Sequence, residues 1–245
     1  MLTGDFQYKV KSHRHFNSIQ SLPKTIKRKL YPVFGYYHNY DISCASVSIM
    51  TQHARHLGLT KLTPTIDHYV QNKRLIRESL SQRTGISEDK IKQVITGIYA
   101  GGKLGHGERF KMTQELNLTK SEVRYLQQDP WIQKYKAEVS MCWRTIKSDL
   151  PEHTRITRSG IIRHLTPTAR EKWQRYFREE SRVILQIESY LKQKQLKCFL
   201  EHDGWVSDQK IDLRALYEHI RYSTGYEIHC EYDYYDLEPD HSESG

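Results

Sequence analysis

The sequence lacks a long uninterrupted run of apolar residues, and its first 16 residues, MLTGDFQYKVKSHRHF, contain no apolar segment like that of a secretory signal peptide. A membrane span needs roughly 18 or more apolar residues in succession. We therefore expect no membrane segment and a cytoplasmic location, the host cytoplasm if the protein is viral.

Paired cysteines are also absent. The four cysteines, Cys44, Cys142, Cys198 and Cys230, are widely scattered, which argues against a disulfide framework and against a zinc knuckle. We expect reduced thiols in or near the core. No internal repeat and no long low-complexity tract is present, so repeat architectures are excluded. The end of the chain, residues 231–245, is acidic and is expected to fray.

Aromatic residues and positive charge are plentiful. The chain has 245 residues, long enough to bury a core, and 17 Tyr, 6 Phe and 4 Trp offset a mean hydropathy of −0.75. Lys and Arg number 38 against 29 Asp and Glu, which gives a net charge of +9. A folded basic protein of this kind favours a polyanionic partner, nucleic acid first.

Hydrophobic periodicity predicts an α+β fold, a small antiparallel sheet with helices on one face and a helical subdomain. A strand over residues 33–41 precedes a helix over 45–57, and a ββαβ unit follows a long helix from 173 to about 195. Further helices are expected over 64–80, 88–99 and 131–146. Asp129 and Pro130 suit the start of the last of these, and Asp212 is expected to cap the helix of the ββαβ unit. We divide the chain into a basic N-terminal segment (1–32), a first segment of the sheet (33–60), a helical subdomain (61–170), a second segment of the sheet (171–235) and an acidic tail (236–245).

Two aspartates occupy distinctive places in this scheme. Asp41 lies where a strand meets a helix, and Asp203 lies in a turn between two strands. Each alone has an ordinary structural explanation, as a residue near a helix start or in an Asp-Gly turn. If the strands are neighbours, the two carboxylates meet and would suit two Mg²⁺ ions, which activate an attacking hydroxyl and stabilise departing pyrophosphate.

A basic helix adds a third feature. Lys90 and Lys92 could hold a triphosphate, Tyr99 could pack beside an incoming base, and the glycines that follow allow a close backbone approach. A second basic segment, residues 22–30, could rest on phosphate, although a solvated helix face is the favoured interpretation.

Together these residues resemble motifs A, B and C of the single-subunit right-hand polymerases, the phage-type RNA polymerases and the family A DNA polymerases. The three stretches are YDISCAS (40–46), KIKQVITGIYAG (90–101) and HDG (202–204). The resemblance implies that residues 33–60 and 171–235 form a palm and residues 61–170 the fingers. It implies that Asp41 and Asp203 bind two metal ions with help from the backbone carbonyl of Ile42. It also implies that Tyr99 lies against the nascent pair and that His202 lies near the growing strand's terminus.

The sequence departs from this family in places. Ile91 occupies the position of the family's triphosphate lysine, so Lys90 or Lys92 is expected to substitute. The basic residue expected four positions earlier is absent, and Arg83, Arg77 or Lys73 is expected to replace it. Ser46 stands where the DNA-making relatives have a bulky residue that blocks a ribose hydroxyl, which favours ribonucleotides.

The predicted function is therefore template-directed nucleotide transfer, first as a minimal phage-like RNA polymerase or its catalytic subunit, and second as a compact DNA polymerase. A non-enzymatic nucleic-acid-binding module is the rival hypothesis from another class, and a metal-dependent nuclease ranks last. The short chain suggests that a partner subunit supplies missing polymerase segments. Glu179 and Glu180 are interpreted as a solvated stripe paired with Arg178 and Arg182, and Lys103, Arg155, Arg158 and Arg163 are predicted nucleic-acid contacts.

Overall fold

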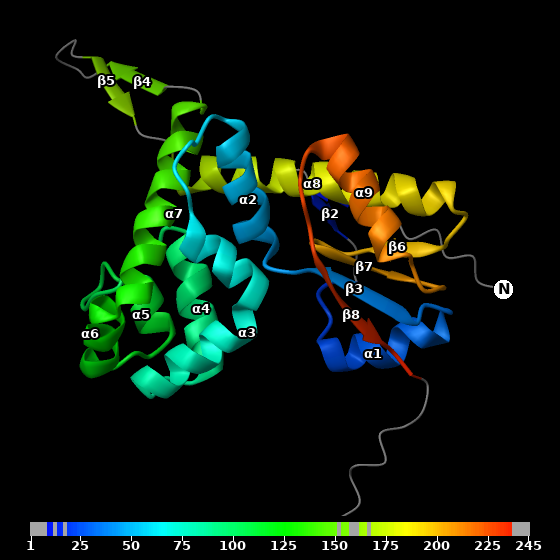
Figure 1. Cartoon of the computed structure of the whole chain (residues 1–245), viewed down its shortest axis with the longest axis horizontal. Helices are drawn as coiled ribbons and strands as arrows, with labels where there is room; N and C mark the ends of the chain where they lie inside the picture. Colours follow the sequence, from blue (N-terminus) through cyan, green and yellow to red (C-terminus); the bar gives the residue numbers. More distant parts are fainter. Residues whose placement is uncertain are drawn as a thin grey trace, which may run out of the picture. The chain divides into compact units, whose positions relative to one another are not determined.

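The computed structural model describes residues 9–11, 14–16, 19–150, 153–156, 162–165 and 168–236. The chain divides into two compact units, which are shown in Figure 1 and described separately below. Unit 1 comprises Met1–Ala45 and Trp173–Gly245, and unit 2 comprises Ser46–Lys172. The predicted long helix, α8 (Ala169–Gln193), begins in the last residues of unit 2 and continues through unit 1.

Unit 1 is built on a four-stranded antiparallel sheet in the order β6-β7-β3-β8. Its strands are β3 (His38–Ile42), β6 (Cys198–Leu200), β7 (Gly204–Ser207) and β8 (Cys230–Tyr234). This confirms the predicted α+β fold and its small sheet. Strand β3 begins later than predicted because the preceding helix α1 (Lys24–Val33) continues to Val33 and is followed by a turn at Gly35, where φ is 80°.

The expectation that the chain frays from Glu231 onward is wrong for the first residues of that stretch. Glu231 lies inside β8 and pairs with Asp41 of β3. The sequence CEYDY alternates along this strand, so Glu231 and Asp233 share one face of the sheet and Tyr232 and Tyr234 share the other. Acidic composition predicted a tail, but the pairing with β3 decides the structure here.

Helices lie on both sides of this sheet. Helices α8 and α9 (Leu213–Thr224) lie on one side and α1 on the other (Figure 1). On the α9 side Tyr40 stacks on Trp205 with ring centroids 5.3 Å apart, and the Tyr40 hydroxyl accepts a hydrogen bond from the Ile211 backbone. On the α1 side Tyr31 packs against Phe199. The sequence predicted helices on one face of the sheet only, and α1 covers the opposite face as well.

Two glutamates of α8 correct another expectation. Glu179 and Glu180 are 4% and 0% exposed, not solvated. Glu179 does pair with Arg182 at 2.6 Å as predicted, but it also accepts the Tyr226 hydroxyl at 2.9 Å, and Glu180 accepts the hydroxyl of Tyr176. Tyrosine hydroxyls supply the hydrogen bonds that a buried carboxylate needs.

Unit 2 is helical in its core. It contains α2 (Ala45–His56, of which Ala45 belongs to unit 1), α3 (Pro64–Thr84), α4 (Glu88–Tyr99), α5 (Lys111–Glu115), α6 (Lys120–Gln128) and α7 (Pro130–Ser148). Helix α3 packs against α4, α6 and α7. Asp129 caps α7 as predicted, accepting the backbone N–H groups of Trp131 and Ile132.

Two short antiparallel pairs, β1 (Lys9–Lys11) with β2 (Arg14–Phe16) in unit 1 and β4 (His153–Ile156) with β5 (Ile162–Leu165) in unit 2, complete the described elements.

A buried carboxylate secures the start of α3. Glu138 of α7 accepts the Thr65 and Ile66 backbone N–H groups at 3.1 and 2.9 Å. We expect Glu138→Ala to lower the free energy of unfolding by about 1–3 kcal/mol, because two buried donors lose their acceptor. Chemical denaturation measures this, with Glu115→Ala on the short helix α5 as the control. Equal effects of the two substitutions would contradict the capping role.

The four cysteines have the reduced state expected from their scattered positions. All four cysteines are free, and burial raises the pKa of Cys142 and of Cys198 to about 11, so both are protonated at neutral pH.

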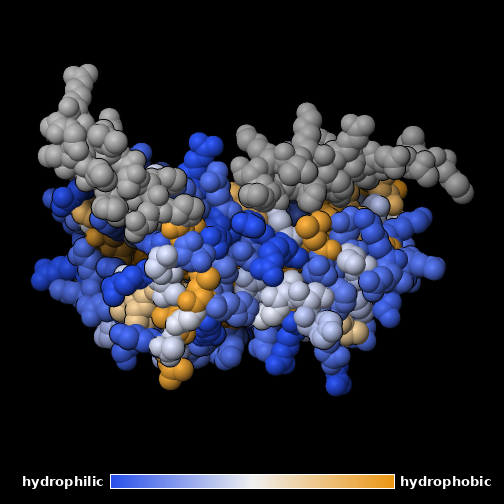
Figure 2. Space-filling view, turned by 90° about the horizontal axis from the view of Figure 1, so that it is seen from above, coloured by the Kyte–Doolittle hydropathy of each residue, from blue (hydrophilic) through white to orange (hydrophobic). Residues whose placement is uncertain are grey.

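Figure 2 shows hydrophilic residues over most of the described surface on the face it presents, with smaller hydrophobic areas between them. Within the described ranges, none of the helices combines the length and hydropathy that a membrane crossing requires.

Candidate active site

The sheet of unit 1 brings Asp41 and Asp203 together. Asp41, on β3, lies opposite Gly204 of β7, and the Ile42 N–H donates to the carbonyl of Asp203 at 2.8 Å. Asp203 is therefore the last residue of the turn before β7 and sits beside the end of β3. Asp41 and Asp203, 162 positions apart in sequence, therefore lie at the same end of the neighbouring strands β3 and β7.

Gly204 is required by this close approach. A Cβ atom at this position would lie 2.4 Å from the backbone oxygen of Tyr40 and 3.4 Å from Oδ1 of Asp41. Distances below 3.0 Å to a backbone atom force the strands apart. Gly204 therefore allows β7 to approach β3 beside both aspartates.

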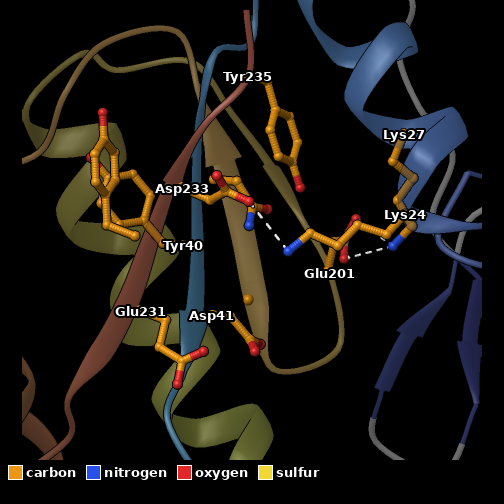
Figure 3. A pocket seen from close by; sticks show the side chains of 11 residues that line it. Lys24, Lys27, Tyr40, Asp41, Glu201, Glu231, Asp233 and Tyr235 are labelled. Carbon is orange, nitrogen blue, oxygen red and sulfur yellow. Dashed lines mark hydrogen bonds and ion pairs between the residues drawn. The ribbon is translucent and has the colours of Figure 1, made fainter. Parts of the chain in front are cut away.

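A cavity of about 320 Å³ opens beside Asp41 on the α1 side of the sheet. Figure 3 shows the side chains of Asp41 and Glu231 at one end, from adjacent strands, and those of Lys24 and Lys27 on the wall formed by α1. Asp203 is outside the set of lining residues, at the neighbouring turn. The cavity is lined by Lys24, Lys27, Asn39, Tyr40, Asp41, Glu201, Gly204, Glu231, Tyr232, Asp233 and Tyr235.

Glu231 is a candidate functional residue that the sequence reasoning missed. It lies directly opposite Asp41 in the β3–β8 register. Like charges directly opposite one another destabilise a sheet, and a bound cation would relieve this repulsion. Burial raises the pKa of the neighbouring Cys230 thiol to about 12, and the negative charge of Asp41 adds to this shift. The alternation of Glu231 with Asp233 in the predicted final strand was the signal available in the sequence.

The carboxylates beside the cavity are those of Asp41 and Glu231, from adjacent strands. Within the described residues, no group of three or more His, Cys, Asp or Glu side chains is placed to hold a metal ion. The two carboxylates offer part of the oxygen shell of a hard divalent cation. Mg²⁺ keeps several waters and takes few carboxylates from the protein, so an incomplete shell of this kind suits it.

Unit 2 carries the residues predicted to hold the nucleotide. Ile91 is 0% exposed and belongs to the core, which explains why a lysine is absent there, whereas Lys92 is exposed and Lys90 half-buried. Tyr99 is only 1% exposed, and its hydroxyl shares a hydrogen bond of 3.1 Å with Thr51. Burial raises the pKa of Tyr99 well above its usual range. In this structure the Tyr99 ring is therefore an internal packing element of unit 2.

The remaining predicted residues are placed as follows. Arg83 donates to Asp129 at 2.9 Å, next to the start of α7, and Ser46 is half-buried in the first turn of α2. His202 is half-buried in the turn that contains Asp203. Lys103 is exposed; Arg155 and Arg163 face each other in the β4–β5 register, with side chains outside the described set, and Arg158 lies outside the described residues altogether.

The small antiparallel sheet of unit 1 and the helices of both units form an α+β chain whose fold is polymerase-like. The chain is similar to the POL domain of Pol1 from M. smegmatis, solved in complex with a DNA primer-template and dNTP. The TM-score is 0.50 at 14% sequence identity, and the match covers 94% of this chain and 46% of that chain. No protein-family model matches the sequence, and no curated protein matches it.

Proposed function

We propose that this protein is a template-directed nucleotidyltransferase that joins nucleotides through a two-metal in-line displacement. The observation that carries the proposal is the β3–β7 pairing, which sets Asp41 beside the turn that holds Asp203, in a chain with a polymerase-like fold. Nucleic-acid template, nascent strand and nucleoside triphosphates are the proposed partners, in agreement with the net charge of +9.

The proposed metal ligands are Asp41, Asp203 and the carbonyl of Ile42, with Glu231 beside them. Bound Mg²⁺ would lower the pKa of the attacking hydroxyl and neutralise charge on the leaving pyrophosphate. The carboxylates of this chain orient the ions, while His202 would lie near the strand terminus. Nucleotide contacts are proposed for Lys90, Lys92, Arg83 and Ser46, and nucleic-acid contacts for Lys103, Arg155, Arg158 and Arg163. Tyr99 is not among the proposed contacts, because its ring is enclosed in unit 2.

The proposed product is RNA, because Ser46 leaves space for a ribose 2′-hydroxyl and can hydrogen-bond it. The DNA alternative is favoured by one observation, the similarity to a domain solved with a DNA primer-template and dNTP. The chain spans 46% of that structure's chain. A partner subunit that supplies further polymerase segments is part of the proposal.

Substitution of Ser46 tests the sugar preference. We expect Ser46→Glu to shift the ratio of ribo- to deoxyribonucleotide incorporation towards deoxyribonucleotides by about 10-fold or more, since a longer side chain would meet the 2′-hydroxyl. Competition between the two nucleotide types in one extension reaction measures the ratio. Ser48→Glu is an unsuitable control because Ser48 is buried, so the half-buried Gln52→Glu on the same helix serves instead. An unchanged ratio in Ser46→Glu would count against this position.

The decisive experiment for the function is extension of a labelled primer on DNA and on RNA templates with Mg²⁺, supplying ribo- or deoxyribonucleotides separately. Extension by the wild-type chain, alone or with its partner, supports the polymerase. Binding of primer-template with no extension under any of these conditions would favour the non-enzymatic nucleic-acid-binding module.

A further inference from the structure

Lys27 of helix α1 packs against the sheet of unit 1, whereas Lys24, Arg28 and Lys29 are exposed, as the solvated face favoured from the sequence requires. Lys27 donates to both carboxylate oxygens of Glu201 at 2.9 Å, and its side chain is only 14% exposed. The Tyr31 hydroxyl donates to the same carboxylate at 2.5 Å. Glu201 thus fixes one side of α1 to the end of β6, and Lys27 is fully engaged.

Lys24 is placed differently, because it shares its acidic partner with another cation. Asp233 of β8 lies 2.5 Å from Arg28 and 3.2 Å from Lys24. The hydrogen bond to Asp233 raises the pKa of the Arg28 guanidinium, and both basic residues counteract the effect of burial so that the pKa of Asp233 is lowered. One carboxylate therefore faces two positive charges, and the Lys24 side chain remains 66% exposed. An additional anion near Lys24 would balance the net positive charge of Lys24, Arg28 and Asp233.

The cavity beside Asp41 joins this basic group to the acidic edge of the sheet. Lys24 and Lys27 line one wall, and Asp41 and Glu231 line the opposite end (Figure 3). The lining contains four carboxylates and two ammonium groups, and with Arg28, which pairs with Asp233 from outside the lining, the formal charge of this set is −1. A phosphate alone would be repelled by this charge, whereas a divalent cation would be attracted and would make the set positive.

We infer that this cavity binds a phosphate group together with a divalent cation, with the cation at Asp41 and Glu231 and the phosphate in contact with Lys24. This inference rests on the proposed function and adds two residues to it, Lys24 as a phosphate contact and Glu231 as a metal ligand. The volume of about 320 Å³ accommodates a pyrophosphate and its ion. Lys27 is a positioning residue, because its pair with Glu201 holds α1 over the cavity.

The charge arrangement makes the two ligands interdependent. Binding of the cation removes the repulsion that phosphate would meet, and phosphate in turn supplies the cation with further oxygen ligands. Each ligand must then raise the affinity of the other by the same factor. Phosphate binding that needs a divalent cation is the signature of this site, and a simple basic surface would bind phosphate without one.

Two sources can supply the phosphate: the polyphosphate of a nucleotide and the phosphodiester of a nucleic-acid strand. Both present the same chemistry to Lys24. Inorganic pyrophosphate is the probe for the first source, and a short single-stranded oligonucleotide without a terminal phosphate is the probe for the second. Each is titrated into the full chain with Mn²⁺ and again with the ion removed by a chelator.

Calorimetric titration of matched variants tests the inference. We expect Lys24→Ala to weaken binding of one probe by about fivefold to 10-fold in the presence of Mn²⁺, as for loss of one charge-assisted contact. Lys29→Ala removes the same charge from an exposed position of α1 outside the cavity, and it should leave that affinity within about twofold. The probe that responds identifies the source of the phosphate.

The role of Glu231 as a metal ligand is tested by metal binding alone, without a nucleotide-transfer reaction. We expect Glu231→Gln to weaken Mn²⁺ binding by about 10-fold or more. The electron paramagnetic resonance signal of the free ion measures this binding. Glu218→Gln, an exposed carboxylate on α9, should have no such effect. Thermal unfolding of every variant checks that the fold is retained.

The outcomes separate this inference from the proposed function. Equal effects of Lys24→Ala and Lys29→Ala, or probe binding that is unchanged by the chelator, would overturn the phosphate site even if the wild type extends primers. Unaltered Mn²⁺ binding in Glu231→Gln would remove Glu231 from it. Conversely, cation-dependent pyrophosphate binding that Lys24→Ala weakens would support the site in a chain that fails to extend any primer.

Discussion

Asp203→Asn is expected to lower templated nucleotide incorporation by about 10³-fold or more while the fold is retained. The substitution keeps the size of the side chain but removes the charge that would hold a metal ion at the edge of the sheet. Metal-assisted displacement contributes several kcal/mol to the transition state, and each 1.36 kcal/mol corresponds to a factor of 10 in rate. Single-turnover primer extension measures the loss directly.

The matched control is Glu227→Gln, which removes one negative charge from an exposed site of the same unit, where Glu227 pairs with Arg221. It should extend primers at the wild-type rate. Asp41→Asn should reproduce the loss seen in Asp203→Asn, and the double variant should be no slower than about the worse single variant, because the two carboxylates act on the same ions. Wild-type activity in Asp203→Asn would refute the metal-ligand role.

Gly204→Ala is expected to cost about 3 kcal/mol of unfolding free energy and to weaken Mn²⁺ binding at the same time. The added Cβ would lie 2.4 Å from the Tyr40 backbone oxygen, and a backbone atom in the centre of a sheet cannot turn away as a flexible side chain can. Strand β7 must then move away from β3, and Asp203 would move away from Asp41 with it. Denaturant unfolding and metal titration measure the two effects.

Gly58→Ala is the comparison for this result. Gly58 has a φ of +96° with open space around its Cβ position, so alanine there is strained but meets no neighbour. It belongs to unit 2, and it should lower stability by about 1–2 kcal/mol without changing Mn²⁺ affinity. If Gly204→Ala keeps wild-type metal affinity, the close approach of β7 and β3 is not what positions the two aspartates.

Local sequence signals predicted the elements of this protein well. The helix over residues 88–99 is found with the same bounds as α4, and Asp129 and Asp212 cap α7 and α9 as their positions suggested. Such signals are reliable because hydrophobic period and helix caps act within a few residues of the chain. The sequence left open whether the strands beside Asp41 and Asp203 are neighbours, and the β3–β7 pairing decides that they are.

Features that depend on contacts between distant segments were not predicted. Glu179 and Glu180 have the composition of a solvated stripe, but the hydroxyls of Tyr226 and Tyr176 allow them to be buried. Glu231 looked like the start of an acidic tail until strand pairing placed it opposite Asp41. Composition does not reveal which partner a charged side chain meets across the sheet.

The sequence by itself determined the α+β class, the places of Asp41 and Asp203 at strand ends, and the basic character of α1, because each follows from local pattern and residue type. Only the tertiary structure decided that α1 lies over the sheet, that Lys24 and Glu231 line one cavity with Asp41, and that Gly204 must lack a side chain. These depend on strand register and on the packing of segments up to about 200 positions apart, for which the free energy comes from long-range burial and pairing rather than from any one segment.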